Sequence, residues 1–333
     1  MSSDNFANLK AYFSIPGFFA FLLTASILSI SHFKVSFPII LLERFLPGYG
    51  FIEIALLALY AAFITRKLLD TRLTAIWRLR IWSLFSIVFF LQLILGLLGN
   101  GIFLMTGELH LPIPAIILAG PIFRGGSYFM PILFSITLLF VGPAWCSYLC
   151  YLGSWDLNFS RNRNKPKSVR KQKTVIRFGM LVLVALGAAL LRYLGVSSQT
   201  AGILAVVFAF VGIFVMFFFS RTTGAMVHCL TYCPIGILAD FAGKISPFRL
   251  KIKDECSTCR LCTITCRYDA LNIEDLERKK PGITCTLCGD CLSACKDSFI
   301  TYSFFGFQHK IAYPLFIVTI VTFHACFLGL ARL

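Results

Sequence analysis

The residues best suited to chemistry lie in a polar segment, residues 249–302, that contains the same cysteine run twice. The first run comprises Cys256, Cys259, Cys262 and Cys266, and the second comprises Cys285, Cys288, Cys291 and Cys295. In each run two residues separate the first three cysteines, and three residues precede the fourth. Three thiols at this spacing can wrap a tight loop around three corners of a cubane while backbone N–H groups point at the sulfurs. The runs therefore predict two [4Fe–4S] clusters.

The fourth cysteine of each run is expected to reach across to the other cluster, as it does in two-cluster ferredoxins. The first cluster is then held by Cys256, Cys259, Cys262 and Cys295, and the second by Cys285, Cys288, Cys291 and Cys266. The spacing alone leaves this exchange of fourth ligands open. Zinc ribbons use two C-x2-C pairs separated by a long loop. A third and a fourth cysteine, repeated twice, therefore disfavour zinc.

Two shorter cysteine motifs precede these runs. Cys146 and Cys150 form one C-x3-C pair, Cys229 and Cys233 form another, and in both a glycine stands three residues after the second cysteine. Residues at this spacing share one face of a helix, so each pair can present two sulfurs to one point. Three interpretations are open: a third metal or iron–sulfur centre, redox-active thiols that line an electron path near a quinone, and packing cysteines that behave as small apolar residues.

The elements that must position these cysteines are long apolar segments. The chain has 333 residues, of which 58% are hydrophobic and 14% charged, whereas a soluble domain is about a quarter charged. Seven segments are long enough to cross a bilayer as helices: about 12–30, 49–65, 81–98, 128–147, 174–194, 201–220 and 311–329. We predict an α-helical polytopic membrane protein with an inserted α+β dicluster ferredoxin-like domain. Its parts are a helical bundle over 1–248, the cluster domain over 249–305 and a final span over 306–333.

Positive charge predicts the orientation of the bundle. Lysines and arginines gather in the connections 66–80 and 161–173, whereas the linker 99–127 has one arginine. The positive-inside rule then places the N-terminus, both basic connections and the cluster segment on the cytoplasmic side of a bacterial or archaeal inner membrane. The net charge of +16 is therefore a topology signal. The run 161–173 lies between two spans and lacks interleaved aromatic residues, so nucleic-acid binding is not expected. Thiols stay reduced in the cytoplasm, so the thirteen cysteines are not expected to form disulfides.

With both motif types at the ends of spans, residues 128–300 resemble the NapH/NosR/MauN-type membrane ferredoxins. The resemblance implies a quinol dehydrogenase or electron-transfer subunit of a respiratory complex, with quinone as substrate and other redox subunits as partners. Two features depart from the family pattern. Tyr151 replaces the proline expected after Cys150, and Arg267 and Lys296 replace the prolines that usually follow the fourth cysteines.

Two ionisable residues are candidates for quinone or proton chemistry, because such groups are costly inside a bilayer. They are His228, beside Cys229, and Glu53, within a predicted span. The expected function is electron transfer between the quinone pool and partner subunits. Two alternatives are open: a relay or anchor subunit without its own quinone site, and a metal (copper) reductase or assembly factor for an oxidase. The sequence has no Rossmann fingerprint and no catalytic triad, so substrate chemistry by the chain alone is not expected.

Overall fold

The computed structural model describes residues 14–99, 101–103 and 113–330. The chain forms two compact units. The first unit comprises Met1–His110 and Gly306–Leu333, and the second comprises Leu111–Phe305. Residues 249–305, predicted as a separate domain, thus belong to the same compact unit as the helices that directly precede them. The predicted cytoplasmic N-terminus lies outside the described residues.

The first unit is built from long apolar helices. They are α2 (Ile15–Lys34), α4 (Gly50–Leu69), α5 (Thr74–Leu97) and α17 (His309–Gly329), with a short helix α3 (Leu41–Phe45) and a 3-10 turn at Gly101–Phe103. Helices α2, α4 and α17 pack against one another. Cys326 is buried in their core against Leu28, Ile40 and Ile54, where it packs as a small apolar residue.

The second unit begins with helices that carry the C-x3-C pairs. Its helical part comprises α6 (Ile116–Arg124), α7 (Phe129–Val141), a 3-10 turn (Gly142–Ala144), α8 (Trp145–Tyr148), α9 (Gly153–Ser160), α10 (Arg170–Tyr193), α11 (Ser198–Val215), α12 (Arg221–Thr223) and α13 (Pro234–Ile245). Two π-helical turns, Met216–Ser220 and His228–Tyr232, join α11 to α12 and lead into α13. Such turns are rare and recur at functional sites.

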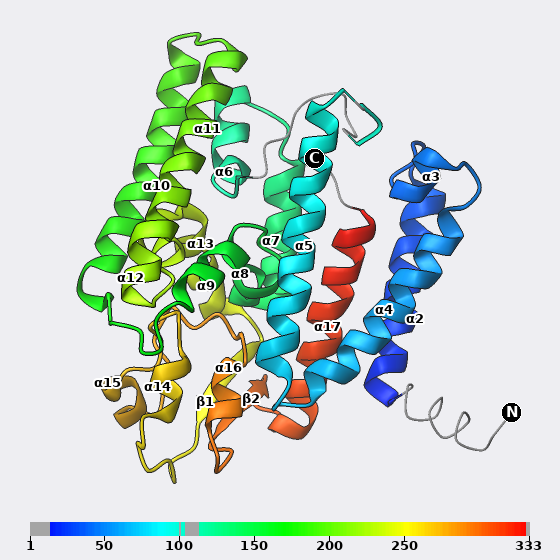
Figure 1. Ribbon diagram of the computed structural model, residues 1–333. Coiled ribbons are helices and arrows are strands. Elements are labelled where there is room, and N and C mark those ends of the chain that lie inside the picture. Colours follow the sequence, from blue (N-terminus) through cyan, green and yellow to red (C-terminus); the bar gives the residue numbers. More distant parts are fainter. Residues whose placement is uncertain (1–13, 100, 104–112, 331–333) are drawn as a thin grey trace, which may run out of the picture. The chain divides into compact units, whose positions relative to one another are not determined.

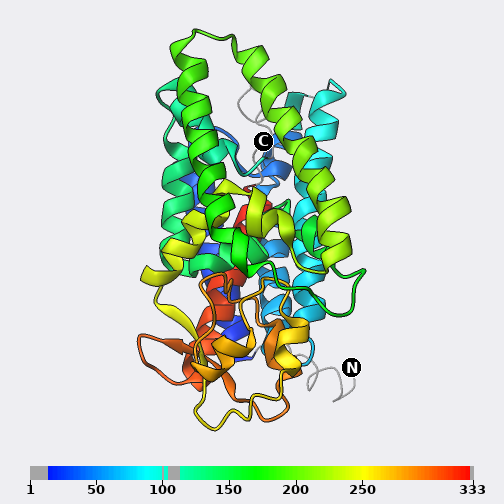
Figure 2. The same ribbon diagram turned by 90° about the vertical axis from the view of Figure 1, so that its left-hand side faces the viewer.

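The rest of the second unit is a small α+β segment. Strand β1 (Phe248–Ile252) pairs antiparallel with β2 (Ile300–Phe304), so that Phe248 faces Phe304. Between them lie the short helices α14 (Leu261–Thr265), α15 (Ile273–Glu277) and α16 (Asp290–Ala294). These elements gather beyond one end of α10 and α11 in both views (Figure 1 and Figure 2). The β1–β2 pair holds the two ends of the cysteine-rich segment together.

Six helical segments are long and apolar enough to cross a membrane: Ile15–Lys34, Thr74–Leu97, Phe129–Tyr148, Lys173–Tyr193, Ser198–Thr223 and His309–Gly329. On Lys173–Tyr193 apolar side chains such as Leu183 and Leu186 are more than 60% exposed, as expected of a lipid-facing surface. These six segments support the predicted multi-pass helical protein. The seventh predicted span falls on α4, which is helical but is not among the six, because Glu53, Arg66 and Lys67 make it more polar.

Candidate functional site

The two cysteine runs fold into matched loops. Helices α14 and α16 each begin five residues after the first cysteine of their run. Backbone residues with positive φ also recur at equivalent places: Thr258 (54°) and Leu287 (54°) before the second cysteine, Arg260 (66°) and Gly289 (82°) after it, and Asp269 (50°) and Ser298 (55°) three residues past the fourth. The two loops thus repeat one backbone conformation.

This shared conformation is costly for most of the residues that adopt it. Gly289 is the only glycine at the six positions, and a left-handed backbone costs a non-glycine residue about 1–2 kcal/mol. Strain of this kind persists where the surrounding structure requires it, commonly at binding sites. Alternating right- and left-handed residues also turn successive N–H groups toward one concave point, which favours a negatively charged ligand.

Backbone N–H groups reach the fourth thiol of each run in the same way. The Ala270 N–H donates to Cys266 Sγ at 3.4 Å, and the Phe299 N–H donates to Cys295 Sγ at 3.3 Å. In both loops the donor stands four residues after the cysteine. Hydrogen bonds of this type to sulfur are among the means by which proteins tune iron–sulfur clusters.

The thiols within each predicted set lie close enough to influence one another. Burial raises the pKa of Cys262 to about 12, and repulsion from Cys256 and Cys295 contributes to the rise. Burial likewise raises the pKa of Cys291, with further contributions from Cys288, Cys285 and Cys266. Each third cysteine is thus near the fourth cysteine of the other run, although Cys266 also acts on Cys262. Cys259 is exposed.

No single-ion site stands out in this part of the chain. Among the described residues, no three His, Cys, Asp or Glu side chains converge closely enough to hold one metal ion. A zinc ion would require four sulfurs at about 2.3 Å from one centre, whereas a cubane holds its thiolates further apart.

The C-x3-C pairs also fold as a repeat. The Cys150 N–H donates to the Trp145 carbonyl at 3.0 Å, and the Cys233 N–H donates to the His228 carbonyl at 2.9 Å. Each bond joins the second cysteine to the residue just before the first, across five residues. Both pairs therefore sit in a wide turn of the π-helical type, whereas the sequence predicted two positions on the face of a regular α-helix.

All four of these cysteines border one cavity. Its lining comprises Cys146, Cys150, Cys229 and Cys233, the aromatic residues Trp145 and Tyr268, the charged residues Arg177 and Asp240, and Leu230, Ile235, Gly236, Thr284 and Thr286. The structure thus brings together two pairs that are far apart in the sequence. We refer to this space as the four-cysteine cavity.

Arg177 and Asp240 form a buried ion pair at this cavity. The Arg177 guanidinium donates to Asp240 Oδ2, and the two side chains are 6% and 8% exposed. Arg177 also packs against Gly236, where any Cβ would overlap the guanidinium.

Three hydrogen bonds connect the first C-x3-C pair to the cysteine-rich segment, two of them to the second cysteine run. Ser147 Oγ donates to the Thr286 carbonyl at 3.0 Å, and Tyr148 OH donates to the Cys288 carbonyl at 3.0 Å. Tyr268 OH donates to the Cys146 carbonyl at 3.4 Å. Sequence reasoning missed these contacts, although two polar side chains between Cys146 and Cys150 were a signal. The four-cysteine cavity therefore directly adjoins the loop predicted to hold the second cluster.

His228 lies beside this cavity but faces another pocket. Its side chain is buried, and the ring fits against Gly212, where an added Cβ would come within 2.8 Å of Cε1. Burial lowers the pKa of His228 to about 4, so the ring is neutral at pH 7. Nδ1 has no hydrogen-bond partner among the described residues. The pocket also includes Phe208 and Tyr232.

Glu53 belongs to the first unit and has a local structural contact. Its Oε2 atom accepts a hydrogen bond of 2.6 Å from the Leu42 N–H. That N–H lies at the start of α3, where helix donors lack partners within the helix. Glu53 and His228, predicted together as quinone or proton residues, thus lie in different compact units.

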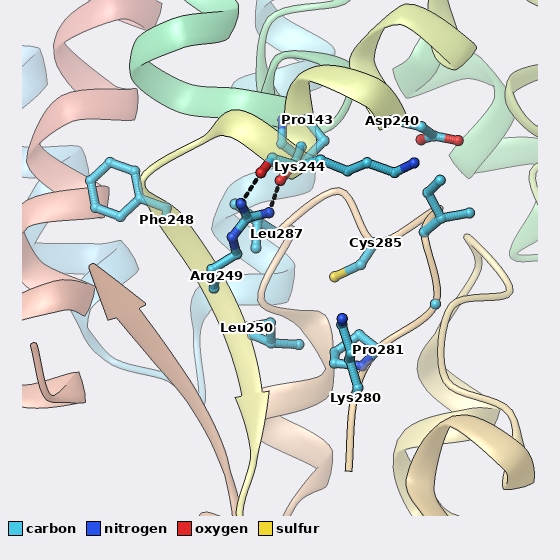
Figure 3. Close-up of a pocket in the computed structure, with 13 residues that line it drawn as sticks. Pro143, Asp240, Lys244, Phe248, Arg249, Leu250, Lys280, Pro281, Cys285 and Leu287 are labelled. Carbon is cyan, nitrogen blue, oxygen red and sulfur yellow. Dashed lines mark hydrogen bonds between the residues drawn. The ribbon is translucent and has the colours of Figure 1, made fainter. Parts of the chain in front are cut away.

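A larger cavity of about 480 Å³ is also lined by Asp240 (Figure 3). It is lined by Pro143, Asp240, Gly243, Lys244, Phe248, Arg249, Leu250, Lys280, Pro281, Gly282, Ile283, Cys285 and Leu287. The Cys285 thiol points into the space between Leu250 and Lys280, and the Arg249 guanidinium donates to the backbone carbonyls of Gly243 and Lys244. No sequence motif marked this cavity, because its residues come from separate elements. We call it the Cys285 cavity.

Comparisons with known proteins give two similar proteins from Methanocaldococcus jannaschii. The uncharacterized protein MJ0749 is 28% identical over 183 residues, which cover 51% of this chain and 69% of that protein. The uncharacterized protein MJ0750 is 25% identical over 183 residues, which cover 51% of this chain and 75% of that protein. No family model and no solved structure matches the chain. Both similar proteins are described only as uncharacterized, so the comparisons assign no function.

Proposed function

We propose that the chain transfers electrons between the membrane quinone pool and partner redox subunits through two [4Fe–4S] clusters. The observation that carries this proposal is the repeated loop. Two cysteine runs of identical spacing share one set of left-handed backbone positions and the same N–H···S bond. The resemblance of the motifs to NapH/NosR/MauN-type membrane ferredoxins supports the same function.

In this proposal Cys256, Cys259, Cys262 and Cys295 hold one cluster, and Cys285, Cys288, Cys291 and Cys266 hold the other. When bound, the clusters supply one-electron chemistry. The protein contributes the geometry and the electrostatics. The matched N–H groups of Ala270 and Phe299 favour negative charge on the sulfurs, and Arg267 and Lys296 place positive charge directly after the fourth cysteines. Both effects favour the reduced state.

We further propose the Cys285 cavity as the place where a quinone ring approaches the second cluster. Its volume of about 480 Å³ lies in the usual range for small-molecule sites, about 300–1,000 Å³. Phe248, Leu250 and Ile283 offer apolar surface, whereas Lys244 and Lys280 offer cations that stabilise a reduced, anionic quinone oxygen. The proposed site also borders Cys285, a cluster ligand, which keeps the transfer distance short.

The test is anaerobic reduction of the iron-loaded, full-length protein in nanodiscs by a short-chain quinol, followed by EPR. We expect quinol to reduce clusters that dithionite also reduces. The Lys280→Gln variant should react about tenfold more slowly, which corresponds to ~1.4 kcal/mol, with unchanged iron content. Lys251→Gln is the matched control, because Lys251 is exposed on β1 and does not line the cavity.

Three outcomes would count against parts of this proposal. Equal rates for Lys280→Gln and Lys251→Gln would exclude the Cys285 cavity as the quinone site. Reduction by dithionite but not by quinol would favour a relay subunit without its own quinone site. A protein without acid-labile sulfide would refute the clusters themselves.

A further inference from the structure

We propose that Cys146, Cys150, Cys229 and Cys233 bind a third iron–sulfur cluster, in the four-cysteine cavity beside the second cysteine run. Nothing in the comparisons assigns this site. The binding of a cluster by these four thiols does not depend on the proposed electron transfer. The role of this cluster in an electron path rests on that proposed function.

The first argument is convergence. Two C-x3-C pairs, one after α7 and one after α12, border the same cavity. Four cysteines that served only in packing would not be expected to border one cavity. The pairs also share a wide turn closed by equivalent hydrogen bonds, from Cys150 to Trp145 and from Cys233 to His228. A repeated local structure that delivers two sulfurs from each side suits a ligand that is coordinated by four thiolates.

The second argument is the set of donors that face the sulfurs. The backbone N–H groups of Leu152 and Gly153 face the Cys150 thiol, and those of Ile235 and Gly236 face the Cys233 thiol. The donors thus stand two and three residues after each second cysteine. A neutral buried thiol is a weak acceptor and gains little from two N–H groups, whereas a thiolate ligand gains much more.

The third argument comes from buried polar atoms that the protein leaves without partners. Arg177 Nε and Thr286 Oγ1 are buried and have no hydrogen-bond partner among the described residues, and both residues line the cavity. Leaving such a group unpaired is unfavourable, and more so for a charged group. A bound cluster offers acceptor sulfurs to both groups, and the Arg177 cation compensates part of the negative charge of four thiolates.

A zinc or copper ion is the alternative occupant of four thiols. Among the described residues no three His, Cys, Asp or Glu side chains converge closely enough to hold one metal ion, and the test below separates a single ion from a cluster. A disulfide is the other alternative, but it would use only two sulfurs and would leave the four N–H donors without charged partners.

The four-cysteine cavity lies next to the loop that is proposed to hold the second cluster. Thr286 stands between Cys285 and Cys288 in the sequence and lines the four-cysteine cavity. Tyr148 joins the first pair to the Cys288 carbonyl at 3.0 Å. The third cluster is therefore adjacent to the second cluster rather than to the first. One electron accepted at the third cluster would be passed on, without change of bonding, to the second.

The test is iron and acid-labile sulfide analysis of the full-length protein, loaded under anaerobic conditions, with Mössbauer spectroscopy. Two cubanes account for about eight iron atoms per chain. We expect about ten to twelve in the wild type, and a loss of about two to four in both Cys150→Ser and Cys233→Ser. Cys326→Ala, which alters a core cysteine of the first unit, should lose none.

The wild-type count tests the proposal even if the serine variants fail to fold. About eight iron atoms in the wild type, or one zinc or copper per chain that is lost in Cys150→Ser, would overturn the third cluster. Failure of the proposed function gives a different result. In that case Cys256→Ser and Cys285→Ser would lose no iron, while Cys150→Ser would still lose the iron of the third site.

Discussion

Gly236 shows, for a single residue, why a glycine follows the second C-x3-C pair. Its N–H faces the Cys233 thiol, and its Cα leaves room for the Arg177 guanidinium. An added Cβ would also come within 3.0 Å of the Cys229 carbonyl. The glycine thus lets a buried cation approach the cysteines, which no larger residue would permit.

We therefore predict that Gly236→Ala destabilises the protein by about 1–3 kcal/mol, the usual cost of overpacking. Gly179→Ala is the matched control, because Gly179 lies in α10 with no atom within 4 Å of an added Cβ. In a helix that change should be neutral or stabilising by up to about 1 kcal/mol. Thermal unfolding in one detergent compares the two. Equal unfolding temperatures would contradict the close approach of Arg177.

The ion pair between Arg177 and Asp240 gives a second prediction at the residue scale. Asp240→Asn leaves a buried guanidinium without its counter-charge, which should cost about 3–5 kcal/mol. The double variant Arg177→Met/Asp240→Leu should recover most of this loss, because no buried charge remains. Glu277→Gln, on an exposed side chain, serves as the control, with an expected change below about 0.5 kcal/mol. A double variant as unstable as Asp240→Asn would show that the pair does not account for the effect.

At the scale of elements, the two cysteine loops differ in one informative position. Gly289 precedes α16 with φ 82°, and Arg260 holds the equivalent place before α14 with φ 66°. The same left-handed turn is therefore built once with glycine and once with a residue that is strained in it. The Arg260 side chain is exposed, so burial in a core does not explain why an arginine stands at this position.

Gly289→Ala should consequently cost about 1–2 kcal/mol, because alanine must adopt the left-handed conformation. Arg260→Gly, which copies Gly289 into the first loop, should cost nothing and can stabilise the loop. Denaturant unfolding of the iron-loaded protein measures both changes. If Gly289→Ala proved neutral, the left-handed turn would not be a requirement of the second loop.

At the scale of the whole molecule, twelve of the thirteen cysteines lie in the second unit, and Cys326 alone lies in the first. Metal sites contribute to folding because they do not exist in the unfolded chain. The two units should therefore respond differently to iron. The first unit is held together by apolar packing of α2, α4 and α17, in which no proposed ligand takes part.

Removal of iron by a chelator should raise amide hydrogen exchange at least tenfold in residues 256–299. Exchange in α2, α4 and α17 should stay unchanged, since local opening follows the contacts that are lost. Mass spectrometry of peptides from protein with and without iron makes the comparison within one molecule. A comparable rise in α17 would show that the first unit also depends on the metal.

The sequence alone predicted the features that depend on local spacing. The equal intervals between the cysteines predict two loops of the same kind. The length of the apolar segments predicts which helices can cross a bilayer, and six of the seven expected spans agree with the structure. The left-handed positions around Thr258 and Leu287 were not predictable, because neither residue favours that conformation and only the folded loop requires it.

Only the tertiary structure determined which side chains from separate elements lie together. Packing of α10 against α13 and the His228–Tyr232 turn brings Arg177 to Asp240 and gathers Cys146, Cys150, Cys229 and Cys233 around one cavity. The Cys285 cavity likewise depends on α13, β1 and the second loop together. Side chains from separate elements carry no mutual signal in a single sequence. Their convergence is set by packing energies that are summed over whole helices.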